Sequence, residues 1–199
     1  MQNRLKPAKI YVISGPSGSG KTTLIKRLAK SRAIRKTITK ITTVTTRLPR
    51  RGEHKGRDYF FVSEEEFSRR KNKGYFAEWQ EVFGNYYGTP KKDLIKELKS
   101  GHDVLLCIDV KGALAIRKVF PKETVLIFIA APDEETLKNR LHQRSTEHKH
   151  SLRRRLRVAK QEMAYRKKYD YCVVNHKVAL AAKELKKIIE GERRKDEKT

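Results

Sequence analysis

The chain has 199 residues, of which 37% are hydrophobic and 36% charged, and 48 Lys and Arg against 23 Asp and Glu give a formal net charge of +25. This length suits one domain with a buried core, and the apolar content excludes a wholly disordered basic tail. Every apolar run is far shorter than the roughly 18 residues of a membrane span. The run at residues 10–13 is also too short for the core of a signal peptide, so we expect a cytoplasmic protein.

The first half of the chain predicts a strand, a loop and a helix, followed by a β-rich insertion. Residues 9–14 form an apolar run that ends in a glycine-rich turn, and residues 22–32 carry Leu and Ile at helical spacing. Farther on, Ser63 predicts the cap of a helix, with Glu66 three residues later as in a capping box. The β-rich segments around this helix are 38–46, 58–62, 76–79 and 86–88.

The second half alternates buried strands with amphipathic helices. The strands are predicted at 103–110, 125–131 and 171–175, and the helices at 91–99, 112–119, 134–144 and 178–190. Such alternation is typical of a parallel sheet covered by helices on both faces, which is the α/β fold class. The charged residues 192–199 are expected to fray. Cys107 and Cys172 lie in apolar strand-like runs, where a buried thiol is expected in place of a disulfide or a metal ligand.

Residues 15–22 carry a phosphate-binding motif. Their sequence GPSGSGKT matches G-x-x-x-x-G-K-[ST] and lies between a predicted strand and a predicted helix, the context that this motif requires. Glycines let several backbone N–H groups point at one anion, and the helix N-terminus adds its dipole. We expect Lys21 to reach the outer phosphates and the Thr22 hydroxyl to ligate a bridging Mg²⁺. The predicted ATP-binding residues here are Gly15, Pro16, Ser17, Gly18, Ser19, Gly20, Lys21, Thr22 and Thr23.

Further motifs resemble those of guanylate kinases in order and spacing. They are TTRLPRRGE at 45–53, GRDYFFVS at 56–63, EW at 78–79, GNYYGT at 84–89, IDVKG at 108–112 and RSTE at 144–147. The resemblance extends from about residue 10 to about residue 185. It implies a P-loop NTPase-type sheet with an inserted β-rich acceptor-binding lobe and a helical lid. It also implies Mg²⁺-dependent transfer of the ATP γ-phosphate to GMP or dGMP, giving ADP and GDP, in purine nucleotide metabolism.

The same resemblance assigns regions and residues. The implied regions are a core at 8–41, 90–139 and 158–190, a GMP-binding lobe at 42–89, a lid at 140–157 and a charged tail at 191–199. The implied GMP-binding residues are Thr43, Arg47, Arg50, Tyr59, Glu78, Tyr87, Thr89, Asp109, Arg144 and Arg155. The implied catalytic residues are Lys21, Arg47, Arg140, Arg144 and Arg155. Asn175 is expected to contact the nucleoside of ATP.

The residue types also suit these roles chemically. Arg47 and Arg50, three residues apart in a turn, can offer fork-shaped donors to a dianionic phosphate. Guanine presents two donors, N1–H and the 2-amino group, which a carboxylate such as Glu78 or Asp109 can accept. A site built to satisfy these donors rejects a base that lacks them, because a buried carboxylate is then left unpaired.

Two groups of residues near these positions are interpreted as structural. In the lid, Arg153, Arg154 and Arg157 match no position of the family pattern and are expected to form a solvated helix face. Tyr86 is expected to be a half-buried aromatic of a strand, because side chains alternate between the faces of a strand.

The chain also departs from the family pattern at a few positions. Cys107 stands where a second carboxylate is usual, Lys111 and Ser145 replace Gln and Gly, and His176 stands where an acid is common. We nevertheless expect an active enzyme in which Thr22 and water shells hold the metal.

Three alternatives stay open from the sequence. The chain could be a P-loop kinase for another phosphorylated acceptor, or a non-catalytic interaction module on the guanylate kinase fold. The intact loop and Arg47 speak against the module, which needs neither. The basic surface could also attract nucleic acid, but no nucleic-acid motif accompanies the charge, so we expect only nonspecific anion binding. The expected partners are ATP and GMP or dGMP, without a membrane, and the sequence does not indicate an oligomeric state.

Overall fold

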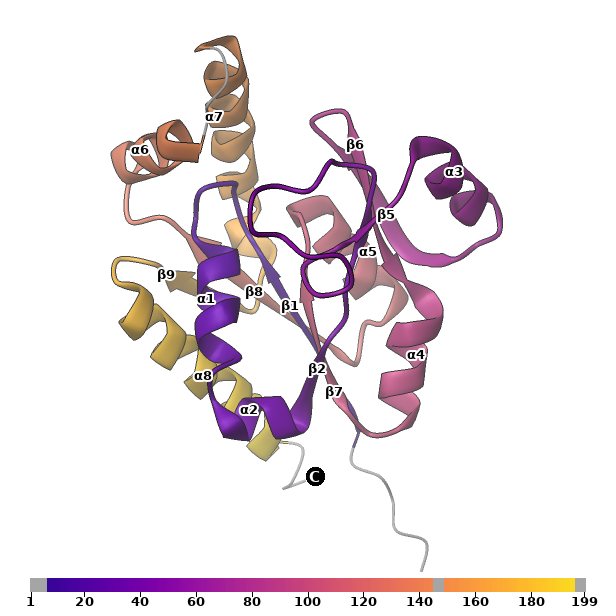
Figure 1. The fold of residues 1–199 in the computed structure, drawn as a ribbon. Helices are drawn as coiled ribbons and strands as arrows, with labels where there is room; N and C mark the ends of the chain where they lie inside the picture. The colour runs from indigo at the N-terminus through magenta and orange to yellow at the C-terminus, as the bar shows by residue number, and fades with distance from the viewer. Residues whose placement is uncertain (1–6, 145–148, 196–199) are drawn as a thin grey trace, which may run out of the picture.

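Two β-sheets organise the chain in a computed structural model that describes residues 7–144 and 149–195, with the backbone alone at 143–144 and 149–152 (Figure 1). The larger sheet contains five parallel strands in the order β2-β7-β1-β8-β9. These strands are β1 (Ile10–Ser14), β2 (Ile38–Lys40), β7 (Asp103–Cys107), β8 (Thr124–Ala130) and β9 (Tyr171–Val174). The parallel sheet predicted from the alternating strands and helices is therefore confirmed.

Helices cover both faces of this sheet. They are α1 (Lys21–Leu28) and α8 (Val178–Lys195) on one face, and α4 (Lys91–Lys99) and α5 (Val110–Val119) on the other. The central strand β1 serves both cores, because its successive side chains point to opposite faces. Tyr11 and Ile13 pack with α1 and α8, whereas Ile10 and Val12 pack with α4 and α5. All four side chains are fully buried.

The smaller sheet is inserted between β2 and α4. Its strands, in the order β4-β3-β6-β5, are β3 (Val44–Thr45), β4 (Phe60–Phe61), β5 (Phe76–Val82) and β6 (Asn85–Pro90). Helix α3 (Glu64–Asn72) covers it, and Phe67 stacks on Phe76 and Tyr86 with ring centroids 4.5 and 5.5 Å apart. Tyr86 also meets Trp79 edge-on, so its predicted structural role is confirmed. The predicted cap is present too, since Ser63 Oγ accepts a hydrogen bond from the Glu66 backbone N–H at 3.2 Å.

Two predicted segments are divided in the structure. The helix expected at 22–32 ends with α1, and the extended backbone of Ser31 starts a second helix, α2 (Arg32–Thr37). The β-branched run at 38–46 contributes β2 to the larger sheet and β3 to the smaller one. The pairing partners of a strand, and not its own composition, decide to which sheet each half belongs.

The charged end of the chain does not fray where expected. Helix α8 continues to Lys195, which corrects the predicted tail at 191–199, and 196–199 lie outside the described residues. Side chains anchor this last part of the helix. Glu192 Oε1 accepts from the Tyr171 hydroxyl and from Lys195 Nζ, both at 2.6 Å, and Arg193 Nε lies 3.0 Å from Asp103 Oδ2.

Helices α6 (Glu134–Arg144) and α7 (Lys149–Ala164) stand above the carboxyl ends of the larger sheet, across from β6 (Figure 1). Leu137 and Leu141 of α6 pack with Leu156 and Ala159 of α7. The predicted lid at 140–157 comprises the end of α6 and the first half of α7, and residues 145–148 between them lie outside the described part. Within the described ranges, no helix combines the length and apolar content needed to cross a membrane.

Candidate active site

A cavity opens at the carboxyl ends of the central strands, between the two sheets and α7. The carboxyl edge of a parallel sheet is where such folds bind ligands, because the loops that leave the strands meet there. The predicted site residues that line the cavity are Gly15, Ser17, Lys21, Thr22, Thr43, Arg50, Tyr59, Glu78, Tyr87 and Asp109. The structure therefore brings the predicted phosphate loop and most of the predicted acceptor residues to one place.

The phosphate loop that follows β1 depends on glycine at three positions. Gly15, Gly18 and Gly20 have φ values of 135°, 88° and 93°, which favour glycine. A Cβ at Gly15 would lie 2.2 Å from the Ile129 carbonyl oxygen of β8, so the loop passes directly against the sheet. Lys21 Nζ donates to the carbonyl oxygens of Gly15 at 2.6 Å and Pro16 at 3.0 Å. The loop thus holds its own lysine at the cavity.

The side chain of Asn175 supports this loop through a hydrogen bond. Its Nδ2 donates to the Ser19 carbonyl oxygen at 2.8 Å, and a Cβ at Gly20 would lie 2.3 Å from that nitrogen. Arg140 Nη2 in turn donates to the Asn175 carbonyl oxygen at 3.1 Å. Asn175 is 1% exposed, so this side chain is packed beneath the loop that it contacts. Its contact with the nucleoside of ATP stays a prediction.

Two carboxylates meet at the N-terminus of α5. Glu78 Oε1 accepts from the Thr89 hydroxyl at 2.6 Å. Asp109 caps α5, and its Oδ1 accepts from the backbone N–H groups of Lys111 at 2.8 Å and Gly112 at 3.1 Å. A Cβ at Gly112 would lie 2.7 Å from Glu78 Oε2 and 3.3 Å from Asp109 Oδ2. Glycine at this position therefore lets the two acids approach one another.

Burial makes these acids hold protons tightly. Burial raises the pKa of Glu78 to about 7; the Thr89 hydroxyl opposes this rise, and the Asp109 charge adds to it. Burial also raises the pKa of Asp109, against the opposing effect of the two capping N–H groups. Neutral pH therefore leaves Glu78 divided between its acid and its carboxylate, unless a ligand that donates hydrogen bonds favours the charged form.

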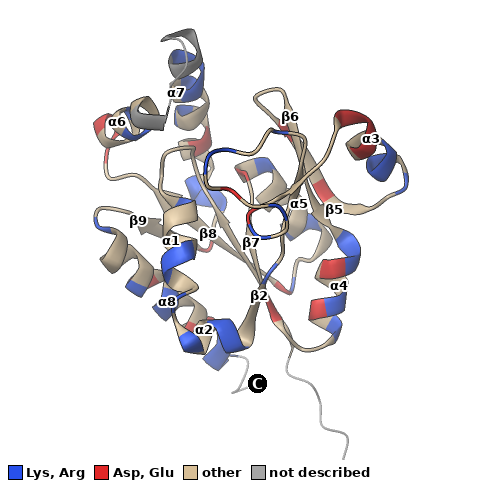
Figure 2. Ribbon diagram, viewed as in Figure 1, with Lys and Arg blue, Asp and Glu red and all other residues tan. Residues whose placement is uncertain are grey.

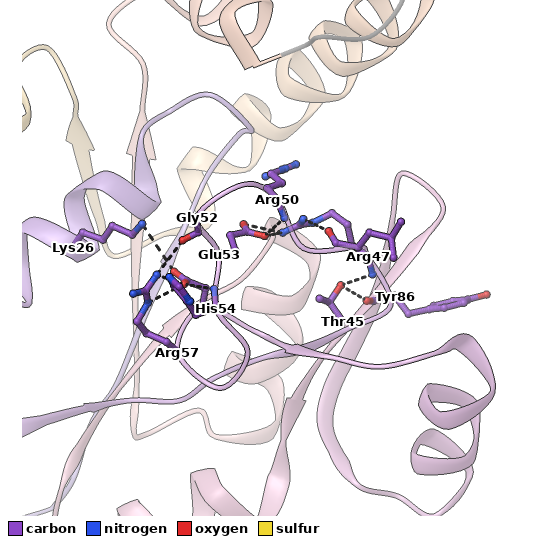
Figure 3. A network of polar contacts seen from close by, with 11 residues as sticks. Lys26, Thr45, Arg47, Arg50, Gly52, Glu53, His54, Arg57 and Tyr86 are labelled. Carbon is purple, nitrogen blue, oxygen red and sulfur yellow. Dashed lines mark hydrogen bonds and ion pairs between the residues drawn. The ribbon is translucent and has the colours of Figure 1, made fainter.

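The loop that follows β3 is organised by Glu53, which the sequence analysis did not single out. Arg47 Nη2 donates to both carboxylate oxygens of Glu53, at 3.0 and 2.9 Å, and Glu53 Oε2 also accepts from the Arg50 backbone N–H at 2.9 Å (Figure 3). The Arg47 guanidinium lies 5.4 Å from the centre of the Tyr59 ring. Arg47 is thus held beside the cavity, whereas the Arg50 side chain lines it. The sequence signal for Glu53 was an acid three residues after Arg50.

Arginines of α7 reach the tip of the smaller sheet. Arg154 and Arg155 each lie 5.9 Å from the ring centre of Phe83, a cavity residue with φ 53° in the turn between β5 and β6. Arg153, Arg154 and Arg157 are exposed, as expected for a solvated helix face, and Arg154 lies near Phe83 in addition. The side chain of Arg144 lies outside the described residues. No sequence pattern singled out Phe83, because its role depends on a helix 70 residues away in the chain.

Glu162 of α7 is the other cavity residue that the sequence analysis missed. It lines the same cavity as Ser17, Lys21 and Asp109. Burial raises the pKa of Glu162 to about 7, and the charge of Lys21 opposes that rise. An acid of α7 therefore lines the cavity together with the phosphate loop.

The oxygen donors at the cavity suit a magnesium ion that arrives with a nucleotide. Among the described residues there is no cluster of three or more His, Cys, Asp or Glu that could hold a metal ion. Mg²⁺ keeps several waters and usually takes one or two protein oxygens with substrate phosphates. The Thr22 hydroxyl at the start of α1 and the Asp109 carboxylate can supply them. Burial raises the pKa of Cys107, so this thiol stays neutral and does not replace a carboxylate.

Comparison with known proteins identifies the family behind this arrangement. The family model described as guanylate kinase matches residues 7–192. The chain belongs to the guanylate kinase family. A guanylate kinase of Caldanaerobacter subterraneus is 43% identical over 189 residues, which cover 94% of this chain and 89% of that protein. A guanylate kinase of Clostridium tetani is 44% identical over 184 residues, covering 92% of this chain and 86% of that protein.

A solved structure agrees with the sequence relatives. The crystal structure of guanylate kinase from Anaplasma phagocytophilum matches with a TM-score of 0.79 at 34% identity, and covers 94% of this chain and 87% of that one. The resemblance and the P-loop α/β fold predicted from the motifs are confirmed.

Proposed function

We propose that this chain transfers the γ-phosphate of ATP to GMP, giving ADP and GDP. The observation that carries this proposal is the cavity itself, in which the phosphate loop with Lys21 faces the acids Glu78 and Asp109. One wall suits the phosphates of a donor, and the opposite wall suits a base with two hydrogen-bond donors. The relatives that match nearly the whole chain carry the name of this activity. We expect dGMP to be accepted too, because none of the proposed contacts involves the 2′-hydroxyl.

The acceptor wall discriminates by hydrogen bonding. We assign Glu78 and Asp109 to the N1–H and 2-amino groups of guanine, with the buried hydroxyls of Thr43 and Thr89 beside them. Adenine lacks both donors on that edge and would leave a buried acid unpaired, so it should be rejected strongly. The phosphate of GMP would bind the residues at the other end of this wall, which are Arg47, Arg50, Tyr59 and Tyr87.

Transfer requires positioning and positive charge, and no covalent intermediate. Lys21 would hold the phosphate that moves, and the proposed lid would add Arg140, Arg144 and Arg155. Thr22 would help to hold Mg²⁺, which would supply positive charge to neutralise the phosphates of ATP. Arg155 lies 5.9 Å from the ring centre of Phe83, which lines the cavity, so closure of the proposed lid there would exclude water from the reacting groups.

The proposed division of labour follows the two sheets. Residues 42–89, which hold the smaller sheet and α3, would form the GMP-binding lobe. Residues 140–157 would form the lid, and the remaining larger sheet with its helices would form the ATP-binding core. We propose the cytoplasm as the location, since ATP and GMP are both available there.

A coupled assay of ADP release tests the proposal. The protein is supplied with ATP, Mg²⁺ and, in turn, GMP, dGMP, AMP or a ribose phosphate, and Lys21→Ala serves as the inactive control. We expect turnover with GMP and dGMP, and a loss of at least about a hundredfold in kcat/KM for Lys21→Ala. AMP preferred over GMP would contradict the assignment of the two acids. Turnover of ribose phosphates alone would favour a different P-loop kinase, and no turnover with any acceptor would favour a non-catalytic module.

A further inference from the structure

The turn at 54–58 lies between residues that form the proposed phosphate end of the acceptor wall. Glu53, directly before it, holds the Arg47 guanidinium and the Arg50 backbone. Tyr59, directly after it, lines the cavity. A displacement of this turn would therefore shift groups on both sides of the acceptor phosphate at once.

Hydrogen bonds within the turn fix its shape. The backbone N–H of Asp58 donates to the His54 carbonyl oxygen at 3.0 Å, and the His54 N–H donates to Asp58 Oδ2 at 3.0 Å. The Gly56 N–H donates to the Tyr59 carbonyl oxygen at 2.9 Å. Because these bonds close the turn on itself, we expect it to move as one unit with Tyr59.

Little packing holds this turn to the rest of the protein. A cavity of about 460 Å³ lies between it and α1, and its lining includes Ile25, Lys26 and Ala29 of the helix and Arg57 and Asp58 of the turn. Lys26 Nζ lies 4.0 Å from Asp58 Oδ1, and the Lys26 side chain is 61% exposed, so this ion pair contributes little. Burial of apolar surface is what usually holds segments together. Where a cavity takes its place, the position of the turn depends on hydrogen bonds.

Two side chains at the end of β2 supply such hydrogen bonds. Lys40 Nζ donates to the Arg57 carbonyl oxygen at 2.9 Å, and Thr42 Oγ1 donates to the Gly56 carbonyl oxygen at 3.1 Å. The bond from Lys40 has a charged donor, which makes it stronger than a neutral one. Two successive carbonyl groups of the turn are therefore held from the end of one strand.

The strand that carries Lys40 is also connected to the proposed base end of the acceptor wall. Lys40 pairs with Leu105 of β7, and the Ile41 N–H donates to the Leu105 carbonyl oxygen at 3.1 Å. Strand β7 ends at Cys107, two residues before Asp109. Lys40 thus links the phosphate end of the wall to the base end through a strand pair of the larger sheet.

We propose that Lys40, together with Thr42, positions the acceptor phosphate. It holds the turn at 54–58 against the larger sheet and so fixes Tyr59 and Glu53 at a set distance from Asp109, without touching either substrate. This inference rests on the proposed binding of GMP along this wall, but it does not depend on which base the acceptor carries.

Steady-state kinetics with ATP and GMP test this role on the wild type, Lys40→Met, Lys40→Arg, Thr42→Val and Lys36→Met. Methionine keeps the apolar stem of lysine without its charge, and valine keeps the branched shape of threonine without its hydroxyl. Lys36 is an exposed residue of α2 and serves as the matched control. We expect Lys40→Met and Thr42→Val each to raise the KM for GMP about fivefold, with the KM for ATP and kcat changed by less than about twofold.

Rescue by Lys40→Arg is the decisive result, because a guanidinium can donate to the same carbonyl oxygen. We expect this variant and Lys36→Met to have the KM of the wild type for GMP. A wild-type KM for GMP in Lys40→Met, an equal rise of the KM for ATP, or a Lys40→Arg enzyme as weak as Lys40→Met would each overturn the proposal. If Lys40→Met does not fold, Thr42→Val decides in its place, and a wild-type KM for GMP there would overturn the proposal equally.

The same variants separate this role from the proposed function. If the protein phosphorylates a different acceptor, Lys40→Met and Thr42→Val should raise the KM for that acceptor, and only the assignment of GMP is refuted. If it phosphorylates GMP with an unchanged KM in both variants, only the role of Lys40 and Thr42 is refuted. If no acceptor is turned over, calorimetric titration with GMP replaces the KM, and binding that is not weakened in these variants overturns the role.

Discussion

Glu78 combines two demands that oppose one another. To accept the proposed hydrogen bonds from guanine it would have to be charged, yet it is 7% exposed and has a neighbouring acid, so the protein around it favours the neutral form. The Thr89 hydroxyl, 2.6 Å from Oε1, offsets only part of this cost. An acid in this setting recognises a ligand that itself supplies the missing hydrogen-bond donors.

GMP binding should therefore depend on pH near neutrality. The pKa of Glu78 is raised to about 7, so the charged form that is proposed to bind guanine is lost as the pH falls through that value. We expect the KM for GMP to rise by up to about tenfold per pH unit below 7 and to level off near pH 8. Steady-state kinetics between pH 6 and 8 measure this dependence. The KM for ATP over the same range reveals any contribution of Glu162, whose pKa is also about 7.

A flat KM for GMP between pH 6 and 8 would show that Glu78 is not the group that accepts from the base. The variant Glu78→Gln provides the control. Its KM for GMP should be raised at every pH, and its pH dependence should disappear, because an amide does not titrate in this range.

Glu53 acts on the loop that follows β3. Both of its carboxylate oxygens accept from Arg47 Nη2, and the exposed fractions of the two side chains are 12% for Arg47 and 18% for Glu53. A half-buried, charge-assisted hydrogen bond of this kind restricts the direction of a guanidinium more than an exposed contact does. The same carboxylate holds the backbone N–H of Arg50. One acid thus orients both arginines that are proposed to bind the acceptor phosphate.

Replacing this acid should weaken acceptor binding more than catalysis. We expect Glu53→Gln to raise the KM for GMP about tenfold with a smaller change in kcat, because it releases Arg47 and the Arg50 backbone together. The control is Glu64→Gln, an exposed acid at the start of α3 in the same lobe. Equal kinetics for Glu53→Gln and wild type would contradict an orienting role.

The arrangement of Glu78 and Asp109 also depends on Gly112 in the first turn of α5. Gly112 leaves room for Glu78 Oε2, which would lie 2.7 Å from a Cβ at that position. Gly112→Ala should therefore push Glu78 away from Asp109 and raise the KM for GMP by more than about tenfold, even though alanine favours helices. The matched control is Gly191→Ala in α8, where a Cβ meets nothing within 4 Å. A Gly112→Ala enzyme with normal affinity for GMP would show that the two acids need not approach so closely.

Local pattern predicted the elements that the core requires, and it missed those that depend on distant partners. The pattern sufficed where a segment's own sequence determines which of its side chains are buried. This holds for the apolar runs of β1, β7 and β8 and for the amphipathic spacing of α4 and α5. The division of 38–46 between two sheets depends on pairing with strands far along the chain. In the same way, the phosphate loop and Glu78 were predicted from motifs. Phe83 and Glu162 match no sequence motif, because α7 comes to lie over the cavity only in the folded chain.

The charge of the whole molecule is distributed unevenly around this cavity. The first acidic residue of the chain is Glu53, so α1 and α2 carry Lys and Arg without a single acid (Figure 2). Their exposed basic residues are Lys26, Arg27, Arg32, Arg35 and Lys36, and Lys30 between the helices is exposed as well. Lys26 also reaches across to the loop after β3, with its Nζ 4.0 Å from Asp58 Oδ1. A positive potential on this side raises the rate at which anionic substrates arrive, and salt weakens it.

The buried acids should also limit the stability of the folded protein. Because the pKa of Glu78 is raised from 4.5 to about 7 on folding, its contribution to stability is greatest below pH 4.5 and is lost as the pH rises through 7. A shift of that size corresponds to a cost on the order of 3 kcal/mol at alkaline pH. We expect Glu78→Gln to raise the Tm by several degrees at pH 8 and to change it little at pH 5. Thermal unfolding followed by circular dichroism at both pH values measures this effect, and a lower Tm at pH 8 would contradict it.

Trp79 is an intrinsic fluorescent probe of the proposed acceptor wall. It is the one tryptophan of the chain, it follows Glu78 directly along β5, and its ring is 37% exposed with Lys71 Nζ 3.8 Å from the ring centre. Because neighbouring residues of a strand point to opposite faces, the indole lies outside the cavity while its backbone moves with the acid inside it. Intrinsic fluorescence therefore reports on the acceptor lobe without an added dye, and stopped-flow mixing can time the arrival of a nucleotide there.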